Sequence, residues 1–403
     1  MILFERIFLP ISAVSISIYI VIVIPLSFAV FLDLLRKKRF LLPKHTMPFL
    51  VTYVALMFLG LQGRNINVLI GRFLLFFAFL ITYNLLIDIK FDNKIKLKLS
   101  FIIAILLFIS TTTMLTDYFH ITKFLKYLNL DSYHDFLKVG RPSSILGAET
   151  NFTSARLGAL LPFLFYYILN EKKHTLKFSF VLFTLLLTVI AQILTGSRMG
   201  YITLLLTILV IIYLIFTKFN VKTILITILI LVILSAIGVQ VIKYELNNSS
   251  LSWRMRNVEN FVKQKGDFSK GENSIAVRFI LFVAGLDMIK NHPVFGVGLG
   301  NSRYETLKYI NEGYGMRYLH NTFLGLGAEN GLIPLILFLI LYFHIIVKAI
   351  RLSSKDNFWL FLALSMVIQF INFFFLSDIL NRVFWVILLP IGNLALLQKI
   401  DKQ

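Results

Sequence analysis

The sequence predicts an all-α integral membrane protein with about 11–12 transmembrane helices and one large external loop that contains short helices. Three observations predict this fold. Hydrophobic residues make up 58% of the 403 residues, which is more apolar surface than a soluble chain of this length could bury. The apolar runs are about 20 residues long, which is the length that crosses a bilayer as a helix. Successive connections alternate between many and few basic residues, as in proteins that cross a membrane repeatedly.

The cysteine and charge content excludes several classes of function. The chain has no cysteine, which excludes disulfides, thiolate nucleophiles and cysteine-based metal sites. Forty Lys and Arg residues against 20 Asp and Glu residues give a net charge of +20. These basic residues are scattered among short loops instead of being gathered in one domain. This pattern argues against a nucleic-acid partner and indicates cytoplasmic loops beside a lipid bilayer.

The first apolar run extends from Ile7 to Leu35 and ends in the basic segment Arg36–Arg39. No small-residue cleavage site follows the run, and the positive charge comes after it. We therefore expect an uncleaved membrane anchor and no signal peptide. The run is long for one span and short for two, so both alternatives stay open.

Ten further spans are expected from the apolar runs, and with the first run they make eleven. The total is twelve if the first run is a broken hairpin. The ten spans cover residues 46–62, 67–88, 99–117, 155–170, 178–195, 200–217, 223–242, 321–347, 358–376 and 383–398.

The basic connections predict the orientation of the spans. The positive-inside rule places these connections in the cytoplasm, and it leaves residues 118–154 and 243–320 outside. The basic connections are residues 36–45, 88–98, 170–177 and 348–357.

We expect one membrane domain with three parts, which are N-terminal helices over residues 1–242, the external loop over 243–320 and C-terminal helices over 321–403. Within the loop, the pattern predicts a helix from Ser252 to Lys265. An apolar helix is expected to begin at Ser274 and to end at Asn291-His292-Pro293.

Two arginines stand where a phosphate could be bound. Arg278 lies in an apolar helix whose residues 275–286 contain no other charge, so it needs an anion, either a carboxylate such as Glu329 or a phosphate. Arg198 follows Ser197 in a tight turn between two helices. Ser197 can cap the second helix, and the freed amides there can bind an anion. A snorkelling arginine is the alternative for Arg198.

Four more residues are candidates for the site. His320 stands where the external loop enters a membrane helix, and it is either a helix-cap histidine or a base. Asn321 could cap that helix or orient a substrate. Glu329 lies in the same apolar run, where a partner for an arginine is preferred over a catalytic acid. Arg156 opens another span on the outer side.

Metal and nucleotide sites are not expected. His292, His320 and His344 are isolated in the sequence, and no acid follows them at ligand spacing. No Walker loop is present, and the glycines at 296–300 follow no predicted strand, so they are not a dinucleotide fingerprint.

The chain resembles the O-antigen ligase and polysaccharide polymerase family of bacterial envelope glycosyltransferases. The resemblance is carried by motifs in a fixed order. They are the turn Thr195–Arg198, the segment Val277–Phe279 with the downstream Asn291–Gly300, and the segment His320–Gly331. The similarity covers roughly residues 150–345, whereas the first four spans resemble the family in hydropathy alone.

The resemblance implies a membrane glycosyltransferase of the C type in the bacterial inner (plasma) membrane, with its site facing the periplasm or exterior. The donor would be a glycan on undecaprenyl pyrophosphate, the acceptor a glycan or lipid, and no cofactor would be needed. Arg198 and Arg278 match the arginines that hold the pyrophosphate, and His320 matches the histidine at the acceptor hydroxyl. A flippase and a chain-length regulator are further expected partners. Twelve spans are usual in this family.

Three functions compete. A polymerase that joins repeat units of a surface polysaccharide is preferred, and a ligase that transfers the finished glycan to a lipid core or protein acceptor is second. A transporter or flippase would need polar residues near the middle of the membrane. In this sequence the polar candidates gather near the outer mouth, which argues against a transporter.

Overall fold

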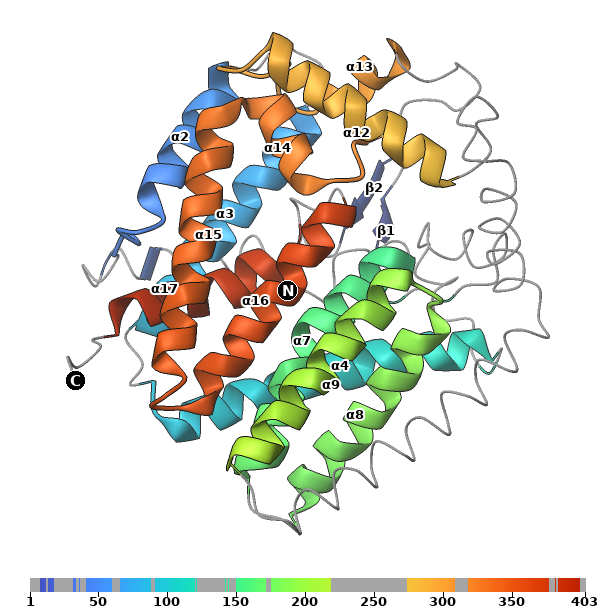
Figure 1. Cartoon of the computed structure of the whole chain (residues 1–403), viewed down its shortest axis with the longest axis vertical. Helices are drawn as coiled ribbons and strands as arrows, with labels where there is room; N and C mark the ends of the chain where they lie inside the picture. The colour runs from blue at the N-terminus through green and yellow to red at the C-terminus, as the bar shows by residue number, and fades with distance from the viewer. Residues whose placement is uncertain are drawn as a thin grey trace. The chain divides into compact units, whose positions relative to one another are not determined.

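The computed structural model describes residues 8–11, 14–17, 32–33, 36, 41–59, 66–87, 91–119, 121, 142, 144, 150–171, 175–218, 274–308, 318–376, 381 and 383–398. This part of the chain is almost entirely helical (Figure 1). Within it, five helices are long and apolar enough to cross a membrane. The prediction of an all-α integral membrane protein is confirmed.

The chain divides into two compact units, each assembled from separate stretches of sequence. Unit 1 contains residues 1–30, 90–255 and 355–369. Unit 2 contains residues 31–89, 256–354 and 370–403.

Unit 1 is a packed group of membrane helices in which α7 touches α4, α8 and α9. The close packing depends on small residues. A Cβ atom on Gly200 would come within 2.2 Å of the Ser154 Oγ, and one on Gly158 within 2.7 Å of the Thr203 Oγ1. Small residues of this kind let membrane helices approach closely. The helices are α4 (Asn93–Tyr118), α7 (Thr150–Asn170), α8 (Leu176–Leu194), α9 (Arg198–Lys218) and the first part of α16 (Asn357–Phe375).

A partly buried ion pair joins the beginnings of α4 and α16 in unit 1. The Lys96 Nζ lies 2.5 Å from the Asp356 Oδ2, and the rings of Phe91, Phe358 and Trp359 surround the ammonium group at 5.6–5.9 Å. Both residues come from connections that the charge pattern places on the same side of the membrane. The ion pair agrees with that part of the predicted topology.

The start of the first apolar run differs from the expected anchor. Residues Phe8–Ile11 and Val14–Ser17 form β1 and β2, a short antiparallel pair in which Phe8 lies opposite Ser17. Pro10 cannot donate an intrahelical hydrogen bond, and the surrounding Ile and Val residues favour strands. The remainder of the run up to residue 31 lies outside the described residues.

Unit 2 is held together by an aromatic core. The ring of Trp385 lies against Phe49 of α2 and against Phe76 and Phe79 of α3, with centroid distances of 4.9–6.3 Å. Pro390 leaves one carbonyl of the last helix without its usual donor, and the chain forms a π-helical turn there. The elements are α2 (Met47–Leu59), α3 (Ile66–Ile87), α12 (Ser274–Asn291), α13 (Ser302–Glu305), η4 (Thr306–Lys308), α14 (Thr322–Asn330), α15 (Leu332–Leu352), the end of α16, η6 (Phe384–Leu388) and α17 (Leu389–Leu397).

The expected span 321–347 is two helices and not one. Helix α14 ends at Asn330, Gly331 adopts a φ of 84°, and α15 begins at Leu332. A continuous helix would bring the ring of Pro334 against the carbonyl of residue 330, and glycine adopts a positive φ without strain. The sequence carried this signal in Gly331 and Pro334, three residues apart.

Most other expected elements are confirmed as helices. The spans at 46–62, 67–88, 155–170 and 178–195 match α2, α3, α7 and α8 within a few residues. The later spans at 200–217, 358–376 and 383–398 match α9, α16 and η6 with α17. Helix α4 begins six residues before the expected span at 99, and α12 agrees with the expected loop helix. The expected span 223–242 and loop helix 252–265 lie outside the described residues.

Candidate active site

The glycine-rich segment after α12 is docked on the end of α14. The Val297 N–H donates to the Ala328 carbonyl at 2.7 Å, and the Gly298 N–H donates to the Glu329 carbonyl at 3.2 Å. The last carbonyls of a helix have no partner within the helix. The segment 293–301, called the glycine loop below, therefore completes the end of α14.

Two glycines make this contact possible because the two backbones almost touch. Gly296 has a φ of 67°, and a Cβ there would lie 2.4 Å from the Glu329 carbonyl carbon. A Cβ on Gly331 would lie 2.0 Å from the Val294 oxygen. Both glycines thus serve close packing of the glycine loop against the end of α14.

The other end of α14 is capped by Asn321. Its side-chain oxygen accepts a hydrogen bond from the Leu324 N–H at 3.0 Å, and its backbone is extended. The sequence allowed two roles for Asn321, helix capping and substrate orientation, and the structure shows the capping role. His320 precedes the cap and is partly exposed, whereas its neighbours Leu319 and Asn321 are buried.

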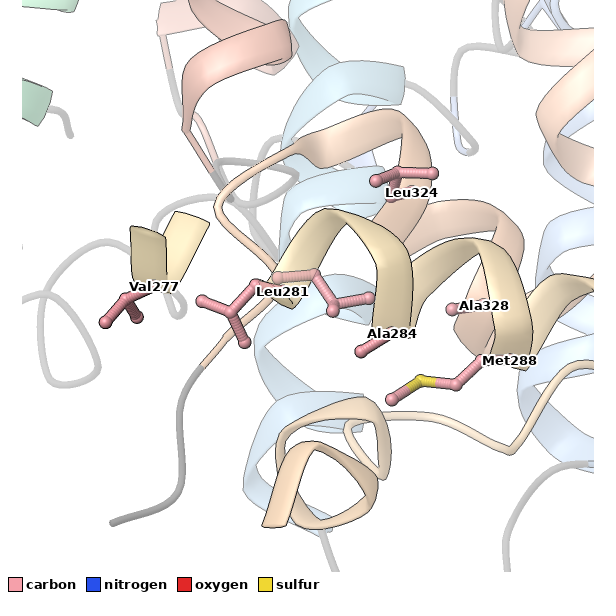
Figure 2. Close-up of a cluster of buried hydrophobic side chains, with 7 residues drawn as sticks. Val277, Leu281, Ala284, Met288, Leu324 and Ala328 are labelled. Atoms are coloured by element: carbon pink, nitrogen blue, oxygen red, sulfur yellow. The ribbon is translucent and has the colours of Figure 1, made fainter. Parts of the chain in front are cut away.

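Helix α12, which carries Arg278, packs along α14. Their shared apolar cluster is drawn in Figure 2, where Val277 lies at the end away from Ala328 and Met288. The cluster consists of Val277, Leu281, Ala284, Met288, Leu319, Leu324 and Ala328.

The register of the two helices locates Arg278. A Cβ on Gly285 would lie 3.3 Å from Leu319 and Leu324, and one on Gly327 would lie 2.9 Å from Ile289. The two helices therefore run in the same direction. Arg278 precedes Gly285 by seven residues, which is about 10 Å of helix. Arg278 and His320 thus lie toward the same end of the α12–α14 pair.

Glu329 is paired with an arginine that the sequence did not indicate. Its Oε2 lies 2.5 Å from the Nη2 of Arg72 in α3, and its Oε1 accepts a hydrogen bond from the Ser302 Oγ at 2.7 Å. The preference for an arginine partner is confirmed, but the partner is Arg72 and not Arg278. Arg72 lies within an apolar span 257 residues earlier in the chain. The one signal in the sequence that could have indicated it is a charged residue inside an apolar span.

The remaining candidates belong to unit 1. Gly196 turns the chain after α8, and the Ser197 carbonyl accepts the first bond of α9 from the Tyr201 N–H at 3.1 Å. Ser197 is therefore at the cap position, and Arg198 is the first residue of α9. Arg156 is buried in α7, with its guanidinium 6.0 Å from the Phe152 ring. These residues lie in unit 1, whereas Arg278 and His320 lie in unit 2.

Arg303 of α13 is held by tyrosines. The Arg303 Nη2 donates to the Tyr304 hydroxyl at 2.6 Å, and the Nη1 donates to the Tyr318 hydroxyl at 3.3 Å. The bond to Tyr304 raises the pKa of the Arg303 guanidinium, which keeps it charged. Tyr318 is two residues before His320, so this positive charge lies near the candidate histidine.

No group of three metal-binding side chains lies together among the described residues. His344, isolated in the sequence, lies against His45 with ring centroids 5.6 Å apart. This pair lies on α15 and before α2, away in sequence from the candidates above.

Comparison with known proteins shows similarity to one protein family. Residues 183–339 match the model of a protein family described as O-antigen ligase. No curated protein matches the chain. The matched residues include Arg198, Arg278, the glycine loop and His320, so the resemblance inferred from these motifs is confirmed. The family indicates glycan transfer of the O-antigen ligase type by a membrane enzyme. Over residues 183–339, this chain is similar to the O-antigen ligase family.

Proposed function

We propose that this protein polymerises a surface polysaccharide, an O-antigen, capsule or exopolysaccharide, by transferring a glycan from undecaprenyl pyrophosphate to a hydroxyl of an acceptor glycan. One observation carries the proposal. A single family match covers both arginines and His320. The proposal is also supported by the positions of Arg278 and His320, which lie toward the same end of the α12–α14 pair.

The chemistry requires few groups. The acceptor oxygen attacks the anomeric carbon of the donor sugar, the bond from that carbon to the pyrophosphate oxygen breaks, and the hydroxyl proton passes to His320. Arg278 and Arg198 stabilise the negative charge on the departing undecaprenyl pyrophosphate. A guanidinium suits this task because its planar fork matches two phosphate oxygens.

The proposed site faces the periplasm or exterior of the inner membrane. The basic connections support this orientation, because they leave residues 243–320 outside. The pairing of Lys96 with Asp356 supports it further, since both residues come from connections expected in the cytoplasm. A flippase that delivers the lipid-linked donor and a regulator of chain length are proposed partners.

Purified protein with a lipid-linked repeat unit tests the proposal, with polymer length read on a gel. We expect His320→Ala to lower the rate by about 100- to 10,000-fold, the usual effect of removing a general base. Arg278→Ala and Arg198→Ala should each abolish polymer, and the lysine variants should recover part of it. EDTA should leave the rate unchanged.

Matched controls are available in the same chain. His292→Ala removes an exposed histidine of the glycine-loop region, and Arg351→Ala removes an exposed arginine at the end of α15. Both should retain wild-type polymer. Wild-type polymer from His320→Ala would remove this histidine from the mechanism, and inhibition by EDTA that Mg²⁺ reverses would contradict a metal-independent reaction. Measurable activity in His320→Gln would assign orientation of the hydroxyl, and not proton transfer, to His320.

The second candidate function is a ligase that transfers the finished glycan to a lipid core or protein. The description of the matched family favours it. The acceptor separates the two functions. A ladder of polymer formed from repeat units alone supports the polymerase. A single product that forms only when a lipid or protein acceptor is added supports the ligase.

A further inference from the structure

A buried ion pair in unit 2 lies outside the proposed chemistry and contacts several segments. Arg72 and Glu329 are 7% and 5% exposed, and their side chains meet at 2.5 Å. Both carboxylate oxygens of Glu329 have protein partners, Arg72 on one and Ser302 on the other. Glu329 is thus engaged by the protein itself, which leaves the purpose of the charge pair to be explained.

The pair joins four segments at one point. Arg72 brings α3, and its Nη1 also reaches the Asn330 side chain at 3.4 Å. Ser302 is the first residue of α13, so its bond ties the beginning of α13 to α14. The Glu329 carbonyl accepts from Gly298 of the glycine loop. Helices α3, α13 and α14 and the glycine loop therefore share one anchoring residue.

His320 lies at the opposite end of the same short helix. Helix α14 has nine residues, so it is about 13 Å long, and both of its ends are completed by hydrogen bonds. A short helix fixed at both ends is a rigid element that can carry coupling between them. His320 directly precedes its capping residue, Asn321.

An ion pair differs from an apolar contact in what it specifies. Replacing a buried ion pair with apolar residues is often neutral for stability, so stability alone gives little reason for the pair. A guanidinium and a carboxylate prefer a defined distance and direction, whereas apolar surfaces can slide. We propose that Arg72 is a positioning residue, which through Glu329 holds α14, and with it His320, in place for glycan transfer. The inference rests on the proposed function for its activity readout.

The test replaces both charges at once, which avoids leaving one buried charge unpaired. For Arg72→Met with Glu329→Leu we expect kcat to fall by about 10- to 100-fold, because misplacement of a reacting group by about 1 Å has effects of that size. The KM for the lipid-linked donor should stay within about threefold, since the arginines proposed to hold the pyrophosphate are unchanged. Arg72→Lys, which keeps the charge and loses the fork, should fall between the double variant and wild type.

Lys96→Met with Asp356→Leu is the matched control. It removes the ion pair of unit 1, which has the same 2.5 Å separation, with Lys96 buried and Asp356 partly buried. Helix α14 belongs to unit 2. Its kcat should stay within about threefold of wild type. An equal fall of kcat in both double variants would mean that Arg72 has only a general structural role.

A second readout is independent of activity. The chain contains no cysteine, so cysteines introduced at Tyr318 and Ile340, both exposed, can carry two spin labels. The distance between the labels should be narrowly distributed with Arg72 present and broad in the Arg72→Met, Glu329→Leu variant. If that variant fails to insert, Arg72→Lys is compared instead. An unchanged distribution together with an unchanged kcat overturns the proposal.

The two readouts separate the two proposals. If the wild-type protein transfers no lipid-linked glycan while the distribution still broadens, the proposed function fails and the positioning of α14 by Arg72 stands. If transfer occurs and neither kcat nor the distribution responds, the proposed function stands and the positioning role is overturned.

Discussion

Two helix junctions near the candidate residues are built from different interactions. In unit 1, the junction of α7, α8 and α9 uses neutral groups from neighbouring helices. The Gln192 amide donates to the Gly200 carbonyl at 3.1 Å and to the Thr203 Oγ1 at 2.8 Å. In unit 2, the junction of α3, α14 and the glycine loop uses the buried charges of Arg72 and Glu329 and a backbone contact at Gly331.

The difference predicts unequal tolerance to substitution. A neutral hydrogen bond between membrane helices contributes on average about 0.6 kcal/mol, because the separated helices find other partners. Removing one partner of a buried charge pair costs about 3–5 kcal/mol. Substitutions at a backbone contact with a positive φ are also costly, because rotation of the new side chain cannot relieve the steric overlap. We therefore expect substitutions at the junction in unit 2 to lower the free energy of unfolding more than substitutions at the junction in unit 1.

The largest effect is expected for Gly331→Val. A Cβ at this position would lie 2.0 Å from the Val294 oxygen, and a β-branched residue is strained at a φ of 84°. We expect the free energy of unfolding to fall by at least about 3 kcal/mol, measured by SDS titration in mixed micelles. Gly285→Ala is the control, because its Cβ would lie 3.3 Å from atoms of the Leu319 and Leu324 side chains and would meet no backbone atom of another segment. Equal stability of the two variants would contradict the close approach of the glycine loop to α14.

A smaller effect is expected at the corresponding glycine of unit 1. Gly200→Ala would bring a methyl group within 2.2 Å of the Ser154 Oγ, and overpacking of this kind costs about 1–3 kcal/mol. In a Ser154→Ala background the cost should fall by about 1 kcal/mol or more, because the remaining Cβ lies at an ordinary 3.5 Å. Additive effects in this double-mutant cycle, followed by the same unfolding titration, would show that α7 and α9 do not meet at these residues.

The smallest effect is expected for Gln192→Met, which keeps the shape of the side chain and removes its hydrogen bonds. The loss in unfolding free energy should be about 1 kcal/mol or less. Glu329→Gln makes a comparably conservative change in unit 2 and leaves Arg72 without a charged partner, so it should cost about 3 kcal/mol or more. Equal losses would remove the distinction between the two junctions.

The helices of this protein could be predicted well from local sequence. Apolar runs locate spans because lipid cannot satisfy backbone groups, so each run must form its own hydrogen bonds. The loop helix with Arg278 and the capping residue Asn321 were readable in the same way, since an end signal and a cap depend on a few neighbouring residues. The break at Gly331 had a local signal too, but the apolar run on both sides concealed it.

The membrane fold, most helix positions and the motifs that resemble the O-antigen ligase family could be read from the sequence, because each depends on residues close together in the chain. The pairing of Glu329 with Arg72 and the packing of the glycine loop on the end of α14 are visible only in the folded structure. The charge pattern did not specify which arginine pairs with Glu329, and the glycines did not indicate the helix end against which they lie. The choice among such partners depends on which surfaces the folded helices bring within about 3 Å of one another, and no local pattern records this.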